Sequence, residues 1–307
     1  MPESSPRTVA VTGSSGLSGQ PLVARLRTAG YQVIRVVRSS PDPGDITWDP
    51  MAGTIDGAAL DGVDAVVHLA GEGIGERRWT PAQKTRIRDS RTRGTELLAS
   101  TLASLERPPA VLLSGSAIGY YGETGDRFVT ENDPPGQGFL AEMAADWEAA
   151  TAPATEAGIR TTLLRTGIIL SPLGGALQRQ LLPFRLGLGG RAGSGQQWQS
   201  WISIDDMVGA IAFLLDRDIP GPVNLTSPNP VTQADFARTL GGVLGRPTLL
   251  PTPVFAVKLA LGAELVDNLL LGSQRVIPRA LDEAGFRWVH PDLTTCLERL
   301  LKGGEES

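Results

Sequence analysis

Apolar residues follow two different periods along the first half of the chain. Short, nearly continuous apolar runs fall at residues 8–11, 32–37, 45–48, 65–69, 110–113 and 161–165. Longer stretches repeat apolar residues at helical spacing, as at Leu22, Val23 and Leu26 and over residues 140–150. Apolar strands that alternate with helices are typical of parallel sheets buried on both faces. The pattern therefore predicts an α/β fold with a doubly wound parallel sheet.

After Thr166 the apolar residues no longer alternate regularly between strand and helix spacing. Five glycines between residues 186 and 195 exclude a regular helix or strand there, so we expect a mobile or tightly turned loop, or alternatively a flap over a substrate. A strand is predicted at 223–225, and Thr232 with Asp235 resembles a capping box that opens a helix. Further helical patterns cover 259–271 and 275–284. We expect a sheet domain at 1–166, completed by later segments such as 198–226, and a mixed, mainly helical part at 167–307.

Composition and charge argue against several classes of protein. The 307-residue chain has a net charge of −5, which is unfavourable for a general binder of nucleic acid or of anionic membranes. Its one cysteine, Cys296, cannot form an internal disulfide, and the two histidines, His68 and His290, are far apart, so no metal site is expected. The sequence has neither an apolar signal core nor a run of 18 apolar residues. We therefore expect a cytoplasmic protein.

A glycine-rich turn lies between the first predicted strand and the first predicted helix, and reads TGSSGLSG over residues 12–19. Gly13 permits a tight turn out of the strand, Gly16 leaves room for a pyrophosphate near the backbone, and Gly19 lets the helix pack close to the sheet. The N–H groups and dipole of the helix N-terminus favour an anion. A plain β-turn is the alternative. Since strand and helix flank the turn, we predict dinucleotide binding by Gly13, Ser14, Ser15, Gly16 and Leu17.

Arg38 ends the second predicted strand, nineteen residues after Gly19. Folds specific for NAD place an acid there for the ribose 2′-hydroxyl, and this chain has none. The guanidinium of an arginine can instead bind a 2′-phosphate. The alternative is an exposed cation at a strand end. We therefore favour NADP over NAD and regard residues 1–166 as an NADP-binding domain.

Small and polar residues follow two later strands. Leu69, Ala70 and Gly71 would let a cofactor pass close to the backbone, whereas His68 is expected to be packed inside its strand. After the run at 110–113 come Ser116, Tyr120 and Tyr121, which could polarise a carbonyl and exchange its proton. A glycine-rich turn with an aromatic plug is the alternative for this segment.

Seven cations lie between residues 77 and 93, along a helix that Thr80 and Pro81 would begin. Most such runs are solvated surface, and the negative net charge argues against a nucleic-acid patch. Contact between one of these cations and a cofactor phosphate is the alternative.

Motifs over nearly the whole chain resemble one divergent branch of the extended short-chain dehydrogenases/reductases, the epimerase-family atypical reductases. Residues 12–19 resemble the TGxxGxxG loop, and further matches are HLAGE at 68–72, RWT at 78–80, SR at 90–91, GYYG at 119–122, FLA at 139–141, WE at 147–148, RTG at 165–167, LPF at 182–184, GLGG at 187–190, WI at 201–202, DD at 205–206, Asn224, PVT at 230–232 and QRVIP at 274–278. The resemblance implies a Rossmann fold of the extended reductase type with a small helix-rich C-terminal substrate or cap region. It also implies NADP contacts at the Gly13 loop, Val37, Arg38, Leu69, Ala70, Arg91 and Ile168.

The resemblance does not supply a mechanism. Extended reductases use a Tyr-x-x-x-Lys pair on the helix after the serine strand, but residues 138–144 read GFLAEMA. Ser203 stands where the family usually has histidine, which would change specificity if that histidine touches substrate. Two functions stay open: an NADP-dependent oxidoreductase or nucleotide-sugar epimerase that uses Ser116, Tyr120 or Tyr121, and a catalytically silent NADP-binding protein that acts as a redox sensor or regulatory module. The intact glycine loop and Arg38 argue against a third function, that of a structural protein which retains only the fold. The expected partner is an unidentified small molecule, with neither nucleic acid nor membrane, and the chain is expected to be a monomer or homodimer.

Overall fold

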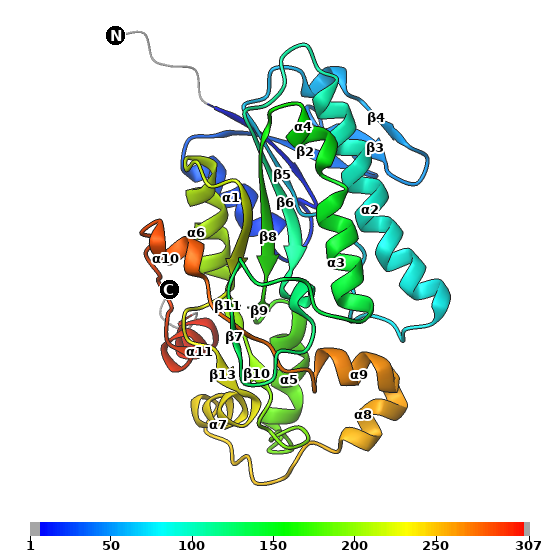
Figure 1. The fold of residues 1–307 in the computed structure, drawn as a ribbon. Coiled ribbons are helices and arrows are strands. Elements are labelled where there is room, and N and C mark those ends of the chain that lie inside the picture. Colours follow the sequence, from blue (N-terminus) through cyan, green and yellow to red (C-terminus); the bar gives the residue numbers. More distant parts are fainter. Residues whose placement is uncertain (1–6, 304–307) are drawn as a thin grey trace.

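An eight-stranded sheet forms the centre of the computed structural model, which describes residues 7–303 (Figure 1). Across the sheet the strands are β12 (Gly221–Leu225), β8 (Arg160–Thr166), β6 (Val111–Ala117), β5 (Ala65–His68), β1 (Thr8–Thr12), β2 (Gln32–Val37), β3 (Ile46–Asp49) and β4 (Thr54–Ile55). All neighbours are parallel except β3 and β4. The six apolar runs of the sequence are all strands of this sheet, so the predicted doubly wound fold is confirmed.

The strand order reverses beside β1. The chain proceeds from β1 outward to β2 and β3, and then returns to β5 on the other side of β1, where Thr12 pairs with His68. The loops after β1 and β5 therefore lead to helices on opposite faces of the sheet. This reversal is the ligand-binding position of doubly wound sheets.

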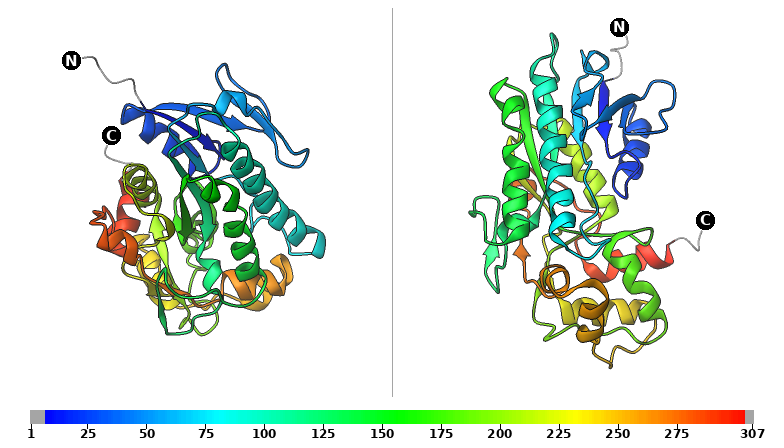
Figure 2. Two further views of the ribbon diagram at one scale, coloured as in Figure 1. Left: turned by 45° about the horizontal axis from the view of Figure 1, so that its top comes forward. Right: turned by 90° about the vertical axis from the view of Figure 1, so that its right-hand side faces the viewer.

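Helices cover both faces of the sheet (Figures 1 and 2). On one face α1 (Gly19–Thr28) and α6 (Ile204–Leu215) pack on Val9 and Val11, and on the other α2 (Pro81–Ala103) and α4 (Ala152–Glu156) pack on Ala10 and Val66. Alternate residues of one strand thus enter opposite cores, which explains why the runs are continuously apolar. α3 (Phe139–Ala149) lies beside α2.

The second part of the chain has a core of its own around Trp201 and Phe184. Its helices are α5 (Gly175–Arg185), α7 (Gln233–Val243), α8 (Val254–Leu261), α9 (Ala263–Leu269), α10 (Arg279–Glu283) and α11 (Leu293–Lys302). Its short strand pairs are β9 (Ile168–Leu170) with β11 (Trp201–Ser203), β10 (Trp198–Gln199) with β13 (Val231–Thr232), and β14 (Arg275–Val276) with β7 (Phe128–Val129). Two 3-10 turns, Ala58–Leu60 and Ile118–Tyr121, complete the elements.

Two helix predictions in this part are wrong in detail. The pattern at 259–271 belongs to two helices, because Gly262 has φ 95° and interrupts the helix between α8 and α9. Residues 275–276 are strand, and α10 begins only after Pro278. Within 198–226, β12 completes the main sheet and α6 packs on one of its faces, whereas β10 and β11 pair elsewhere. The division of the chain at residue 166 stays a prediction.

Side-chain caps begin two helices as the sequence predicts. Thr80 accepts a hydrogen bond from the backbone N–H of Gln83, and Thr232 accepts one from Asp235. Residues 186–195 contain neither helix nor strand; backbone hydrogen bonds such as Leu188 N–H to Pro183 O close tight turns there. Over residues 7–303, no helix is both long enough and apolar enough to cross a membrane.

Candidate functional site

The glycine turn after β1 has the geometry that the sequence predicts for it. Gly13 has φ +65°, and a Cβ there would lie 2.8 Å from the carbonyl carbon of Leu69. A Cβ on Gly19 would lie 2.1 Å from Gly13 O, so neither position accepts a side chain. Gly16 is exposed, and its backbone N–H closes the turn onto Gly13 O at 2.9 Å. Ser18 makes no side-chain cap to α1, so the first N–H groups of this helix have no side-chain acceptor there.

The end of β5 is fixed to the end of β1 by one threonine. The backbone N–H groups of Leu69 and Ala70 donate to Thr12 Oγ1 at 3.1 and 3.3 Å, so the hydroxyl proton of Thr12 is directed to His68 Nδ1 at 2.7 Å. His68 Nδ1 is therefore the acceptor, and Nε2 carries the proton that is donated to Thr95 Oγ1 at 3.0 Å. Burial lowers the pKa of His68 to about 4, which keeps the ring neutral. His68 is a packed strand residue, as expected.

Arg38 lies exposed at the end of β2, and forms neither an ion pair nor a side-chain hydrogen bond with another described residue. The nearby carboxylates are engaged elsewhere, because Arg35 binds both Asp42 and Asp45. The end of β2 thus offers a cation and no free acid. Val37 precedes it, half-buried at the strand end.

Arg91 is the one cation of the basic run that is buried at this edge of the sheet. Its Nη1 donates to Ile87 O, its Nε has no partner within residues 7–303, and its guanidinium lies 5.0 Å from the Trp147 ring. Burial lowers the pKa of Arg91 to about 10, so it stays charged at neutral pH. A Cβ on Gly71 would lie 3.2 Å from the guanidinium carbon. A buried cation with a free donor is suited to an anionic group of a ligand.

The predicted catalytic residues belong to a buried network after β6. Ser116 Oγ donates to Glu148 Oε1 at 2.6 Å, and Arg165 binds the same carboxylate with Nε at 2.8 Å and Nη2 at 2.9 Å. Arg165 Nη1 also donates to the Tyr121 hydroxyl at 3.0 Å, and that hydroxyl donates to Asn224 Oδ1 at 2.7 Å. Ser116 and Arg165 lie opposite each other in the β6–β8 register. The network ties β6, β8, β12 and α3 together.

Tyr120 and Tyr121 differ in what surrounds their hydroxyl groups. Tyr121 is buried, and burial raises its pKa to about 12, so its hydroxyl is a poor proton donor or acceptor at neutral pH. Tyr120 is half-buried, its ring lies 3.5 Å from the guanidinium carbon of Arg165, and its hydroxyl has no partner within residues 7–303. Only Tyr120 has a hydroxyl free to meet a ligand.

The helix that carries Tyr-x-x-x-Lys in typical extended reductases is apolar here. Phe139 begins α3 and packs edge-on against Trp79, with ring centres 5.2 Å apart, while Met143 is fully buried. Ser203 is fully buried as well, and its hydroxyl caps α6 by bonding to Asp206. The side chain at position 203 is therefore enclosed in the core, where it serves as a helix cap.

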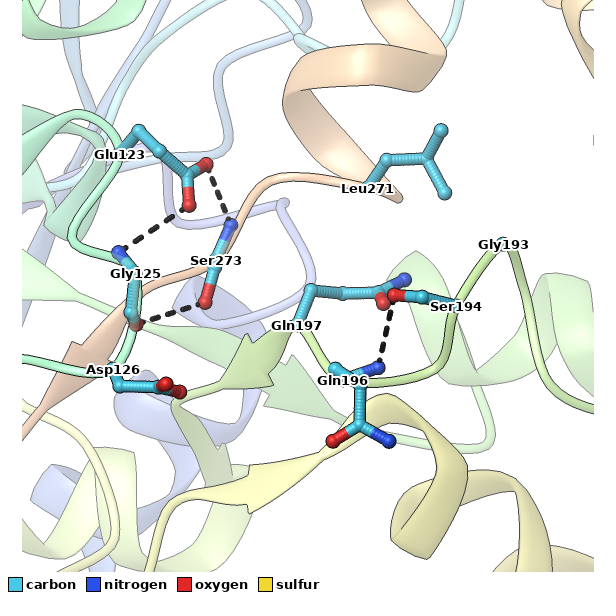
Figure 3. A pocket seen from close by; sticks show the side chains of 9 residues that line it. All are labelled: Glu123, Gly125, Asp126, Gly193, Ser194, Gln196, Gln197, Leu271 and Ser273. Carbon is cyan, nitrogen blue, oxygen red and sulfur yellow. Dashed lines mark hydrogen bonds between the residues drawn. The ribbon is translucent and has the colours of Figure 1, made fainter.

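A separate polar pocket of about 400 Å³ lies between the second part of the chain and the loop after Tyr121 (Figure 3). It is lined by Glu123, Gly125, Asp126, Gly193, Ser194, Gln196, Gln197, Leu271 and Ser273. The backbone N–H of Ser273 donates to Glu123 at 2.9 Å, and Asp126 accepts from the Trp198 indole at 2.8 Å. None of the predicted cofactor residues lines it. Within residues 7–303, no group of three or more His, Cys, Asp and Glu side chains is placed to hold a metal ion.

Glu148, Arg165 and Asn224 are functional candidates that the sequence prediction missed. Arg165 ends the apolar run at 161–165, and an arginine that is buried with such a strand needs a carboxylate. That signal could have indicated Arg165, but not Glu148 as its partner. Ile168, which was predicted, lies half-buried in β9, where its N–H donates to Ser200 O.

Together the reversed strand order, the glycine turn and the serine–tyrosine turn define an extended short-chain dehydrogenase/reductase. The chain belongs to the NAD dependent epimerase/dehydratase family, whose model matches residues 9–225, and a domain of unknown function matches residues 252–300. It is similar to an epimerase family protein of Mycobacterium bovis, with 49% identity over 284 residues that cover 92% of this chain and 93% of the relative. It is also similar to human epimerase family protein SDR39U1, with 35% identity over 297 residues, 95% of this chain and 99% of the human protein. The predicted resemblance to the atypical, epimerase-family branch is confirmed.

Solved structures agree with this assignment. The crystal structure of human SDR39U1 with NADPH has a TM-score of 0.88 and 34% identity, and covers 95% of this chain and 98% of the human chain. A nucleoside-diphosphate sugar epimerase from Corynebacterium glutamicum gives 0.79 and 39%, covering 96% of this chain and 58% of that one. UDP-N-acetylglucosamine 4-epimerase from Bacillus cereus, at 0.77 and 18% identity, shares the fold.

Proposed function

We propose that this chain is a cytoplasmic NADP(H)-binding oxidoreductase or nucleotide-sugar-epimerase-like enzyme that acts on a small molecule. The observation that carries the cofactor choice is the end of β2, where Arg38 is free and Asp42 and Asp45 are held by Arg35. The human relative solved with NADPH supports the same choice.

The residues present fit such a cofactor. Gly13 makes the tight turn at φ +65°, the exposed Gly16 leaves the backbone accessible to a pyrophosphate, and the uncapped N-terminus of α1 favours its charge. Arg91 supplies a buried cation with a free Nε beside Gly71. Ser14, Ser15, Leu17, Val37, Leu69, Ala70 and Ile168 complete the proposed contacts.

Arg38→Ala is expected to weaken NADPH binding by roughly ten- to hundredfold, because one charge-assisted contact contributes about 1.5–3 kcal/mol. Affinity for NADH is expected to stay unchanged. Titration of both cofactors by tryptophan fluorescence or calorimetry measures this, with Arg25→Ala on the exposed surface of α1 as the matched control. Equal wild-type affinity for NADPH and NADH would contradict the cofactor assignment.

For the reaction, we propose Tyr120 as the group that exchanges a proton with the substrate. When bound, the nicotinamide supplies or accepts a hydride. Tyr120 has the free hydroxyl, and the Arg165 guanidinium stacked on its ring fixes its orientation. Ser116, Glu148 and Arg165 then act as positioning residues, because their hydrogen bonds hold the turn that carries Tyr120.

A catalytically silent NADP-binding protein, acting as a redox sensor or regulatory module, is the second candidate. It is favoured by the apolar helix start at Phe139 and by the engagement of Ser116 with Glu148 and of Tyr121 with Asn224. Measuring whether the protein turns over any substrate distinguishes the two candidate functions. NADPH oxidation and NADP⁺ reduction are followed by absorbance across carbonyls, alcohols and nucleotide sugars, and any activity is re-measured in Tyr120→Phe. Tight NADPH binding with no turnover on any substrate class favours the silent protein.

A further inference from the structure

The exposed apolar side chains of the chain gather in its second part. Eight of the twelve large apolar side chains exposed within residues 7–303 lie between residues 182 and 261. Leu249 is 89% exposed and Phe255 is 80% exposed. α8 buries none of its residues fully, although only one of its eight residues is charged. Exposed apolar groups in such number mark an interaction site.

The segments that carry most of these residues lie at one end of the molecule. In Figures 1 and 2, the loop at 186–195, the loop between α7 and α8, and α8 itself lie at the end opposite the amino-terminal ends of the sheet strands. Ala192 bridges to Thr252, and the Thr252 hydroxyl donates to Gly190 O at 2.9 Å, so the two loops are joined. Phe255 and Leu259 are four residues apart on α8 and share one face. We name this the apolar–basic end; its apolar members are Leu182, Leu186, Leu188, Leu249, Leu250, Phe255 and Leu259.

The charge of this end is opposite to that of the whole chain. Residues 171–204 contain three arginines and no acid, whereas residues 235–267 contain two arginines and one lysine against three acids, in a chain of net charge −5. Arg185 and Arg246 are exposed and have no side-chain partner within residues 7–303. The neighbouring carboxylates are already paired: Asp235 with Arg238, Glu264 with Lys84, and Asp267 with Lys258.

From this we infer that the apolar–basic end docks on an anionic lipid surface. Projecting leucine and phenylalanine side chains enter the acyl boundary, while Arg185 and Arg246 meet the lipid headgroups. A second copy of the chain is disfavoured, because a two-fold interface would set one cationic rim against the other. The net charge of the whole chain predicts no membrane contact. That sum does not show that the apolar–basic end carries unpaired positive charge. The inference does not depend on the proposed reaction.

Vesicle sedimentation tests the inference with the full chain. Wild type is expected to sediment with phosphatidylcholine vesicles that contain phosphatidylglycerol, to stay in solution with phosphatidylcholine alone, and to be released by high salt. Leu249→Ser with Phe255→Ser removes two projecting side chains, and Arg185→Gln with Arg246→Gln removes two charges. Each pair is expected to weaken partitioning about tenfold or more.

Met51→Ser with Arg25→Gln is the matched control, because both side chains are exposed and lie outside the apolar–basic end. Unchanged melting temperature and NADPH binding in every variant would show that the fold is intact. The inference is overturned if wild type stays in solution with anionic vesicles, which leaves an acidic protein as the better occupant. It is also overturned if the control loses as much binding, or if wild type self-associates and the Leu249 and Phe255 variant does not.

Discussion

Tyr120 and Tyr121 are adjacent in sequence but perform different tasks. Tyr121 donates to Asn224 and accepts from Arg165 inside the protein, whereas the Tyr120 hydroxyl has no such partner among the described residues. Tyr121→Phe is therefore expected to lower the free energy of unfolding by about 1–3 kcal/mol, because a buried acceptor and donor lose their partner. Tyr120→Phe is expected to change it by less than about 0.5 kcal/mol. Urea denaturation of both variants measures the difference, and a larger loss for Tyr120→Phe would contradict the assignment of roles.

His68 makes the stability of the fold depend on pH. Its pKa is about 4 in the folded chain and about 6.5 when unfolded, so between these values the unfolded state binds the extra proton. Stability is therefore complete above about pH 6.5 and falls as the pH is lowered, by roughly 2 kcal/mol from this residue at about pH 5. Urea denaturation of wild type and His68→Gln at neutral and acid pH isolates this contribution. The same acid-dependent loss in both proteins would mean that another group causes it.

At the scale of elements, two glycines of the turn after β1 are expected to have different tasks, one in cofactor binding and the other in stability. Gly16 is exposed and not at positive φ, and a Cβ there would approach Gly13 O at 3.2 Å, so Gly16→Val is expected to fill the pyrophosphate space, abolish NADPH binding and lower the melting temperature only slightly. Gly19→Ala is expected to lower stability by about 1–3 kcal/mol, because its Cβ would lie 2.1 Å from Gly13 O. NADPH titration and thermal denaturation of the two variants measure both effects. Normal binding by Gly16→Val would place the cofactor away from this turn.

The long elements could be predicted from the sequence, because strands buried on both faces leave continuous apolar runs. The strands of two or three residues could not. β14 pairs with β7 about 150 residues earlier, and such pairing leaves no local period to detect. Its neighbour Gln274 donates to the carbonyls of Ile118 and Gly122, which again depends on distant chain. The broken helix at Gly262 shows the same limit, since glycine inside a helical pattern does not reveal whether the helix bends or ends.

Across the whole molecule, some parts of the candidate site could be predicted from the sequence and others could not. The Gly13 turn and Arg38 are local signals that follow one strand each, so the sequence predicts them. The pairing of Ser116, Glu148 and Arg165 depends on β6, β8 and α3 being brought together by the sheet. The sequence therefore predicts Ser116 as a site residue without revealing that its hydroxyl is already bonded to a carboxylate.

The two parts of the chain meet at the glycine turn itself. Leu17 packs against the start of α5, where a Cβ on Gly174 would lie 2.9 Å from the Leu17 side chain. Ordering the turn with a cofactor should therefore also restrain α5. Hydrogen exchange followed by mass spectrometry is expected to show NADPH slowing exchange at residues 13–19 and at the first turn of α5. In Leu17→Ala the protection of the turn is expected to remain while that of α5 is lost, with Leu173→Ala, an exposed neighbour, as the matched control. Protection of α5 that survives in Leu17→Ala would show that the cofactor restrains this helix directly, without the leucine contact.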